Sequence, residues 1–146
     1  MQYAQNKKAY FNYEIGEKFE AGIELVGHEV KSVRAGRLSL DGSYVLVRGG
    51  EAFLVGATVA AYQPNNTPKE YDPVRLRKLL LTHREIGEIV GFEAHKGLTV
   101  VPLSVYSKGR VIKLELGVAR GKKQHDKRGS IKKREVNREI GRTLKS

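Results

Sequence analysis

Lysine and arginine side chains are concentrated in the last fifth of this sequence. Residues 120–146 contain eleven Lys or Arg and three Asp or Glu, a net charge of +8 in 27 residues. Residues 1–119 contain sixteen basic and thirteen acidic side chains, a net charge of only +3. Because such a segment repels itself and attracts a polyanion, the charge placement predicts a nucleic-acid partner.

Two other interpretations of this basic segment are open. It could be a tail that only aids solubility, although such tails are more often acidic or of mixed sign. It could also bind an anionic membrane surface, but it has no Trp or Phe to insert at the interface.

Patterns typical of catalysis or metal binding are missing from the sequence. The four histidines, His28, His83, His95 and His125, stand at no spacing that would place two on one metal within an element. There is no nucleophile elbow, no phosphate loop and no acidic cluster suited to magnesium. The sequence therefore predicts a binding protein with no metal or cofactor, rather than an enzyme. An active site assembled from distant residues would escape this search.

Three features of the sequence bear on where in the cell the protein works. No run of eighteen apolar residues occurs, so no transmembrane helix is expected. Mixed polar residues follow the first charges, unlike in a secretory signal, and the chain has no cysteine. We expect a cytoplasmic monomer with no membrane contact.

The second half of the basic segment has helical spacing. Val136, Ile140 and Leu144 lie four apart, and an arginine stripe lies roughly opposite them, at Arg134, Arg138 and Arg142. A helix of about fifteen residues is marginal in water, and like charges at i,i+4 oppose it. We expect residues 120–146 to be disordered when free and partly helical on an anionic surface. A helix docked on the chain's own domain is the alternative.

Strand-like runs dominate residues 1–119, which we expect to form one domain. Residues 12–26 predict two strands with a bend at Ala21-Gly22. Two hairpins are predicted, one from residues 43–48 and 52–55 and one from residues 98–106 and 111–118, and residues 57–62 predict a further strand.

Three short helices are predicted between the strands. Their ranges are residues 27–36, residues 72–81 after the cap and proline at Asp72-Pro73, and residues 82–92. Residues 63–73 are the clearest loop. The sum is a mainly β domain of five or six strands, which fits a small antiparallel barrel or sandwich.

The sequence resembles the small protein B (SmpB) family, the partner of transfer-messenger RNA in bacterial trans-translation. The matching segments run in order over nearly the whole chain. They lie at residues 6–9, 19–23, 27–36, 41–45, 77–81, 97–103 and 117–128, and the last, which reads GVARGKKQHDKR, is the most specific.

This resemblance implies a closed six-stranded antiparallel barrel similar to an OB-fold, with three peripheral helices and no enzymatic activity. The barrel, residues 1–119, would bind the tRNA-like domain of transfer-messenger RNA. The complex would reach stalled ribosomes with elongation factor Tu, which is held indirectly through the aminoacylated RNA. The tail, residues 120–146, would bind small-subunit ribosomal RNA at the decoding centre and in the empty messenger channel.

The resemblance also implies two sets of site residues. For transfer-messenger RNA they are Lys7, Lys8, Tyr13, Glu20, Leu80 and Lys113, and Leu80 could equally be a plain core leucine. For the decoding centre they are Arg120, Gly121, Lys122, Lys123, His125, Asp126, Lys127 and Arg128. There His125 would stack on a ribosomal RNA base. Val136 stands where some relatives carry tryptophan.

Two other functions fit the same residues. A structural ribosomal protein with a basic extension would stay on every ribosome, whereas a rescue factor is enriched on stalled ones. An RNA-processing enzyme would turn over RNA when purified.

Overall fold

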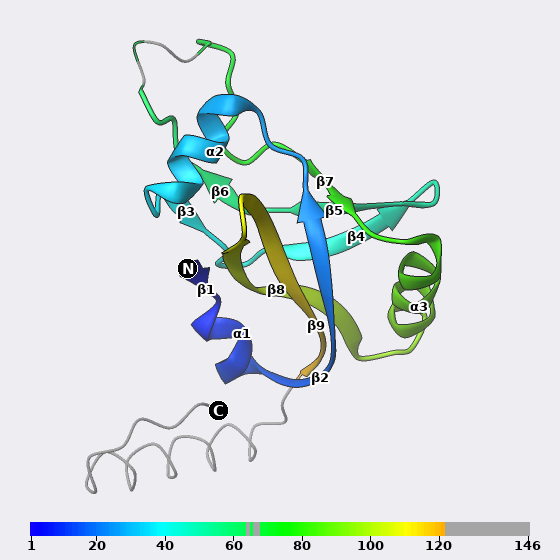
Figure 1. Ribbon diagram of the computed structural model, residues 1–146. Coiled ribbons are helices and arrows are strands. Elements are labelled where there is room, and N and C mark those ends of the chain that lie inside the picture. Colours follow the sequence, from blue (N-terminus) through cyan, green and yellow to red (C-terminus); the bar gives the residue numbers. More distant parts are fainter. Residues whose placement is uncertain (64, 66–67, 122–146) are drawn as a thin grey trace, which may run out of the picture.

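Seven strands form one antiparallel sheet in the computed structural model of the chain, which describes residues 1–63, 65 and 68–121 (Figure 1). Across the sheet the order is β1 (Gln2–Gln5), β8 (Leu98–Lys108), β9 (Val111–Gly121), β2 (Tyr13–Ile23), β7 (Arg77–Leu80), β5 (Glu51–Val55) and β4 (Tyr44–Arg48). Two short strands, β3 (Leu38–Ser39) and β6 (Thr58–Val59), pair separately. The helices of the described residues are α1 (Lys7–Asn12), α2 (Gly27–Arg34) and α3 (His83–Glu93).

The sheet is mainly antiparallel, as predicted, but the prediction of a closed six-stranded barrel is wrong. β1 and β4 are the two edges, and no strand among the described residues pairs them. The sheet curls until β4 contacts β8. However, β1 pairs with β8 from Ser104 to Tyr106, so it occupies part of the edge where a closing strand would have to bind. This short, polar strand was not predicted from the sequence.

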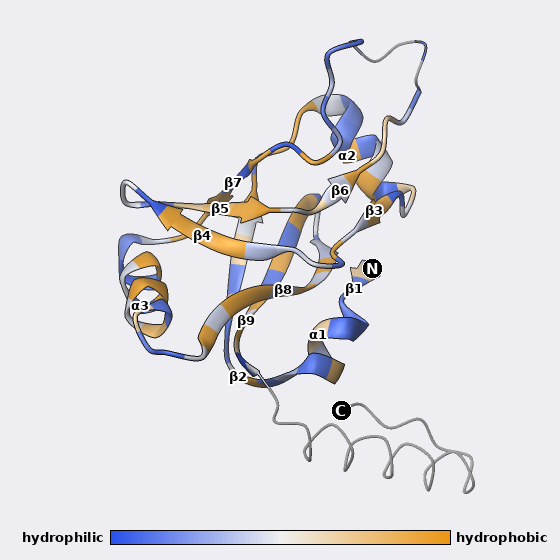
Figure 2. Ribbon diagram, turned by 180° about the vertical axis from the view of Figure 1, so that it is seen from behind, coloured by the Kyte–Doolittle hydropathy of each residue, from blue (hydrophilic) through white to orange (hydrophobic). Residues whose placement is uncertain are grey.

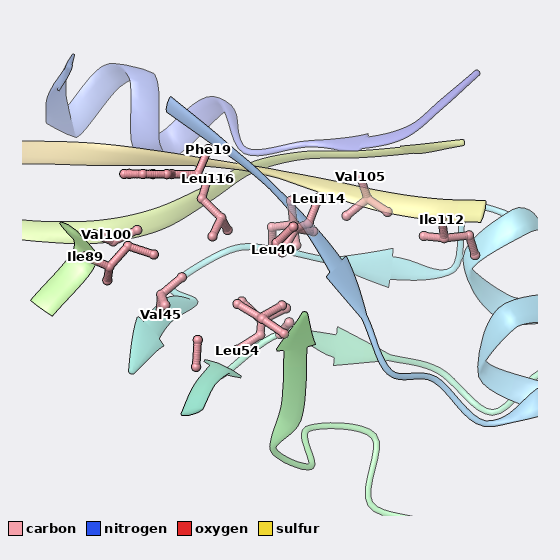
Figure 3. Packing of buried hydrophobic residues seen from close by; sticks show 14 of the residues in the cluster. Phe19, Leu40, Val45, Leu54, Ile89, Val100, Val105, Ile112, Leu114 and Leu116 are labelled. Carbon is pink, nitrogen blue, oxygen red and sulfur yellow. The ribbon is translucent and has the colours of Figure 1, made fainter. Parts of the chain in front are cut away.

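The hydrophobic core fills the space inside the curled sheet. Alternate residues of β2 and β9 point inward, among them Phe19, Leu114 and Leu116, and they face Val45 and Leu54 from β4 and β5 (Figure 3). Figure 2 shows β4 and β5 as largely apolar ribbons, whereas apolar and hydrophilic residues alternate along β9. On one side α3 adds the fully buried Ile89. Each such side chain stabilises the fold by roughly 1.5–3 kcal/mol through burial.

The predicted hairpins and two of the predicted helices are confirmed. The hairpins are β4–β5 and β8–β9, and the helices are α2 and α3. α3 begins as its sequence indicates, because Thr82 accepts a hydrogen bond from the Glu85 amide and the Glu85 carboxylate accepts one from the Thr82 amide.

The predicted helix over residues 72–81 is wrong, because its second half is strand β7. Arg77 and Leu79 are buried while Lys78 and Leu80 face outward, which is the two-residue period of a strand. β7 gains hydrogen-bonded neighbours on both sides, β2 and β5, and this pairing outweighs the local helix-start signal. Asp72 instead caps a turn by accepting from the Val74 amide.

Residues 12–26 also differ from the prediction. Within this range Tyr13–Ile23 form the single strand β2, and the irregularity lies between Ile15 and Lys18, where three steps on β2 oppose two on β9. Ala21 and Gly22 continue the ladder without a bend. The helix α1 was not predicted. It begins at the buried Asn6, whose side chain accepts from the Ala9 amide and donates to the Pro102 carbonyl.

A buried ion cluster ties α2 to the chain that leads into β7. The Glu29 carboxylate is fully buried and pairs with Arg77, which is also fully buried, and with Arg75. The Tyr71 hydroxyl lies within hydrogen-bond distance of Glu29 and of the Val59 carbonyl, and it can donate its single proton to either. Burial by itself raises the pKa of Glu29. Hydrogen bonds from Arg75, Val26 and Arg77 outweigh burial and hold that pKa at about 2.

The Glu29 pKa makes the fold acid-sensitive. A lowered folded-state pKa means that the carboxylate stabilises the fold above its unfolded value of 4.5, and that this contribution is lost as the pH falls through about 2. We expect the free energy of unfolding to fall by roughly 3 kcal/mol over this window from Glu29 alone. Urea unfolding at pH 6, 4 and 2 measures it. As a control, Glu88→Gln, which removes an exposed ion pair with Arg84, should keep this acid sensitivity. If the wild-type chain were as stable at pH 2 as at pH 6, the assigned role of Glu29 would be wrong.

Gly117 allows the second, smaller apolar cluster to pack against β9. A Cβ atom there would lie 2.7 Å from Leu103 Cδ1 and 3.0 Å from Ile15 Cγ2. We expect Gly117→Ala to lower the free energy of unfolding by about 1–3 kcal/mol, because the buried Leu103 has no room to move. In α3, a Cβ at Gly87 meets nothing within 4 Å, so Gly87→Ala should instead stabilise by about 0.5–1 kcal/mol. Equal effects of both changes in urea unfolding would count against this packing argument.

Candidate nucleic-acid interface

One outer face of the sheet carries most of the predicted RNA-binding residues that the structure describes. The register pairs Tyr13 with Gly121 at one end of β2, and Glu20 with Glu115 and Gly22 with Lys113 at the other. Because alternate residues of a strand share a face, Lys113, Glu115 and Gly121 lie on one side of β9, opposite the core. The irregularity between Ile15 and Lys18 keeps Tyr13 and Glu20 on that same side.

Glu20, Leu80 and Lys113 come together around one open hollow. It measures about 570 Å³, and the start of α3 and the β5 end of the sheet complete its wall. Leu80 is 50% exposed, so it is not a plain core leucine. Its side chain lies over Gly22, where a Cβ would be only 3.1 Å from Leu80 Cβ. The hollow therefore combines an exposed apolar side chain with an acidic and a basic one.

The Glu20 carboxylate has a donor on each oxygen. The Tyr106 hydroxyl donates to Oε2 over 2.5 Å, and Lys108 Nζ donates to Oε1 over 3.2 Å. These bonds, the first from Tyr106, lower the pKa of Glu20 and keep it ionised. Burial and the same bond to Glu20 raise the pKa of Tyr106, so its phenol stays protonated. A fixed, ionised carboxylate thus stands at the rim of the hollow.

Lys113 lies on the same face, and its charge helps to lower the pKa of Glu20. It forms no ion pair with any residue that the structure describes, whereas Lys18 pairs with Glu115 over 3.9 Å and Lys108 pairs with Glu20. An ammonium group without a counter-ion can bind an RNA phosphate without first breaking a salt bridge.

The N-terminal residues lie at a second hollow on the same face. Lys8 and Tyr13 line it with Asn12 and Tyr44, and its volume is about 460 Å³. Lys8 forms an exposed ion pair with Asp41, and Lys7 is exposed on α1. The structure therefore divides five of the six predicted residues between two hollows, and Lys7 lines neither. α1 forms part of the wall of the second hollow, and its Ala9 packs in a cluster with Val101, Leu103 and Ala119.

Arg120 and Gly121, predicted as the first tail residues, belong to β9. They pair with Glu14 and Tyr13 and are exposed. The other predicted tail residues, Lys122, Lys123, His125, Asp126, Lys127 and Arg128, lie outside the described residues, as do Val136 and the predicted tail helix.

Tyr106 and Lys108 were not predicted as site residues. A signal for them was present, because the predicted hairpin over residues 98–118 has its turn at residues 107–110. Extending the ladder from that turn places Tyr106 opposite Lys113, as the register shows.

The described residues show neither a membrane-spanning helix nor a cluster of metal ligands. Across residues 1–63, 65 and 68–121, no helix is long and apolar enough to cross a membrane. Within the same residues, no group of His, Asp and Glu side chains gathers as metal ligands would.

Comparison with known proteins decides the family. A family model described as "SmpB protein" matches residues 3–146. The chain belongs to the SmpB family. The SsrA-binding protein of Magnetococcus marinus is 49% identical over 98% of this chain and 95% of its own length. That of Chloroflexus aurantiacus is 52% identical over 97% of this chain and 89% of its own length.

A solved SmpB chain shares the fold. It comes from a structure described as "tmRNA-SmpB: a journey to the center of the bacterial ribosome", with a TM-score of 0.70 and 42% identity. The match covers 97% of this chain and 98% of the other. The resemblance to SmpB noted from the sequence is thereby confirmed.

Proposed function

We propose that this chain binds the tRNA-like domain of transfer-messenger RNA, also called SsrA RNA, and delivers it to stalled ribosomes for trans-translation. Its relatives are named SsrA-binding proteins, and its structural neighbour comes from a tmRNA–SmpB study of the ribosome. The observation that carries the proposal is the meeting of Glu20, Leu80 and Lys113 at one open hollow. These three residues are far apart in the sequence.

The chemistry of the hollow suits folded RNA. Lys113 binds a phosphate, and the exposed Leu80 packs on a ribose or an unstacked base. Tyr13 and Lys8, at the second hollow, extend the contact along the same face. No step of this function needs a reaction, a metal or a cofactor, so the protein acts as a binding factor.

The basic tail has a different partner in this proposal. Residues 122–146 bind small-subunit ribosomal RNA at the decoding centre, where His125 stacks on a base and the lysines and arginines bind phosphates. Elongation factor Tu is held through the aminoacylated RNA. The protein then works as a cytoplasmic monomer, with its RNA-binding domain ending at Gly121, the last paired residue of β9.

Sequencing the RNA that co-purifies with the chain tests the proposal. We expect one dominant RNA with a tRNA-like end, in about equal molar amount to the protein. The basic extension also suits a structural ribosomal protein. For such a protein, ribosomal RNA alone would co-purify in stoichiometric amount, and that result would overturn the proposal.

A further inference from the structure

The Glu20 carboxylate is held by two residues from a strand that is not its neighbour. Tyr106 and Lys108 lie on β8, Glu20 lies on β2, and β9 runs between these strands. Both side chains therefore reach across β9 to meet the carboxylate, one at each oxygen. The spacing of two residues puts Tyr106 and Lys108 on the same face of β8.

The charges around Glu20 argue against a simple RNA contact by its carboxylate. Glu20 stands directly opposite Glu115 in the ladder, and like charges in that position repel each other and repel phosphate. A direct bond from an RNA base to Glu20 must also compete with the donors from Tyr106 and Lys108. The negative charge of Glu20 thus weakens attraction to RNA unless contacts made by Tyr106 and Lys108 outweigh this repulsion.

The partners themselves are placed to bind RNA. The Lys108 side chain is 68% exposed, although its ammonium group is anchored. Tyr106 is half-buried and pairs in register with Lys113. The pair with Glu20 orients the Lys108 side chain, which therefore loses less conformational freedom on binding than a mobile lysine, and the ammonium keeps N–H donors for a phosphate.

We infer that Glu20 is a positioning residue, and that Tyr106 and Lys108 are the RNA contacts it holds in place. This inference rests on the proposed function and adds two residues to the same site. Lys108 binds a phosphate beside the one that Lys113 binds, and the Tyr106 ring packs on a ribose or base edge. Glu20 acts through both and need not touch the RNA.

A mutant cycle in the full chain tests the inference, with the tRNA-like end of transfer-messenger RNA as the probe. We expect Glu20→Ala, Tyr106→Phe and Lys108→Met each to weaken binding roughly fivefold, the effect of one lost net hydrogen bond. In the Tyr106→Phe/Lys108→Met background, Glu20→Ala should cause no further loss. An equal loss from Glu20→Ala in both backgrounds would show direct contact and overturn the inference.

Two readouts separate positioning from a merely structural role. Lys108→Met should reduce the slope of log affinity against log salt by about one, as expected for one phosphate contact. In the free protein, ¹³C NMR of the tyrosine rings should show the Tyr106 pKa falling toward its ordinary value in Glu20→Ala. An unchanged Tyr106 titration would overturn the tether. Urea unfolding of each variant checks that the fold survives.

The outcomes also separate the inference from the proposed function. If the wild-type chain failed to bind the tRNA-like RNA, both would fall. If the wild type bound it but the Tyr106 and Lys108 variants bound equally well, the inference alone would fall.

Discussion

Removal of residues 122–146 is expected to abolish peptide tagging on stalled ribosomes while the truncated chain still binds transfer-messenger RNA specifically. The two functions separate because the hollow at Glu20, Leu80 and Lys113 lies wholly in the described domain. The deleted segment holds ten basic and three acidic residues, a net charge of +7, since only Arg120 of the eleven is kept. Deleting these charges weakens attraction to any RNA. The affinities of the truncated and full-length chains should therefore be compared at about 0.3 M salt, where this non-specific electrostatic attraction is screened.

The position of the cut decides what the experiment reports. β9 continues to Gly121, and its last residues pair with Ile15, Glu14 and Tyr13. A cut after Val118 would remove the fully buried Ala119 and damage the domain, whereas a cut after Gly121 leaves the ladder whole. Tagging is measured by the appearance of the encoded peptide on stalled products. If the truncated chain lost specific RNA binding, or tagged normally, the division of labour would be wrong.

Loss of the Glu29 carboxylate should produce the largest stability change in the described domain. Glu29→Ala leaves the fully buried Arg77 without its counter-ion and Arg75 without its partner. Breaking one member of a buried ion pair costs about 3–5 kcal/mol, a large part of the roughly 5–15 kcal/mol that stabilises a domain. Urea unfolding at neutral pH measures the loss.

A paired replacement distinguishes the unmatched charge from lost packing. Glu29→Met/Arg77→Met removes both buried charges and should recover part of the stability that Glu29→Ala loses. The recovery should be incomplete, because Arg77 also donates to the carbonyls of Ala57, Pro73 and Arg75. If Glu29→Ala lowered the free energy of unfolding by less than about 1 kcal/mol, the cluster would contribute no more than a surface salt bridge does.

Elements with strong local patterns could be predicted from the sequence, and elements defined by their neighbours could not. The β8–β9 hairpin and α3 follow from alternation, turn residues and a cap, all local signals. β7 could not be predicted, because leucine spacing and Asp72-Pro73 favour a helix until β2 and β5 supply hydrogen bonds on both sides. Whether the sheet closes depends on which strand reaches the edge of β8. The strand that does so is β1, and its four mostly polar residues have no clear strand pattern in the sequence.

The same distinction holds for the site. Family resemblance indicated Glu20, Leu80 and Lys113, but only the register shows that the last two flank Gly22, opposite each other across β2. The exposure of Leu80 needed the structure, because a leucine beside Leu79 and Leu81 is typical of a core. Tyr106 could have been found by counting back from the hairpin turn. Its bond to Glu20 could not, because it crosses an intervening strand.

The most direct test of the central claim is the affinity of full-length variants for the tRNA-like end of transfer-messenger RNA. Lys113→Glu alters the outer face, and Lys69→Glu makes the same charge change on the exposed segment before β7. We expect Lys113→Glu to weaken binding by at least about tenfold and Lys69→Glu by less than about threefold, because only the first breaks a phosphate contact. Equal losses from the two variants, or equal wild-type affinity for an elongator tRNA, would contradict the claim that this hollow recognises the tRNA-like RNA.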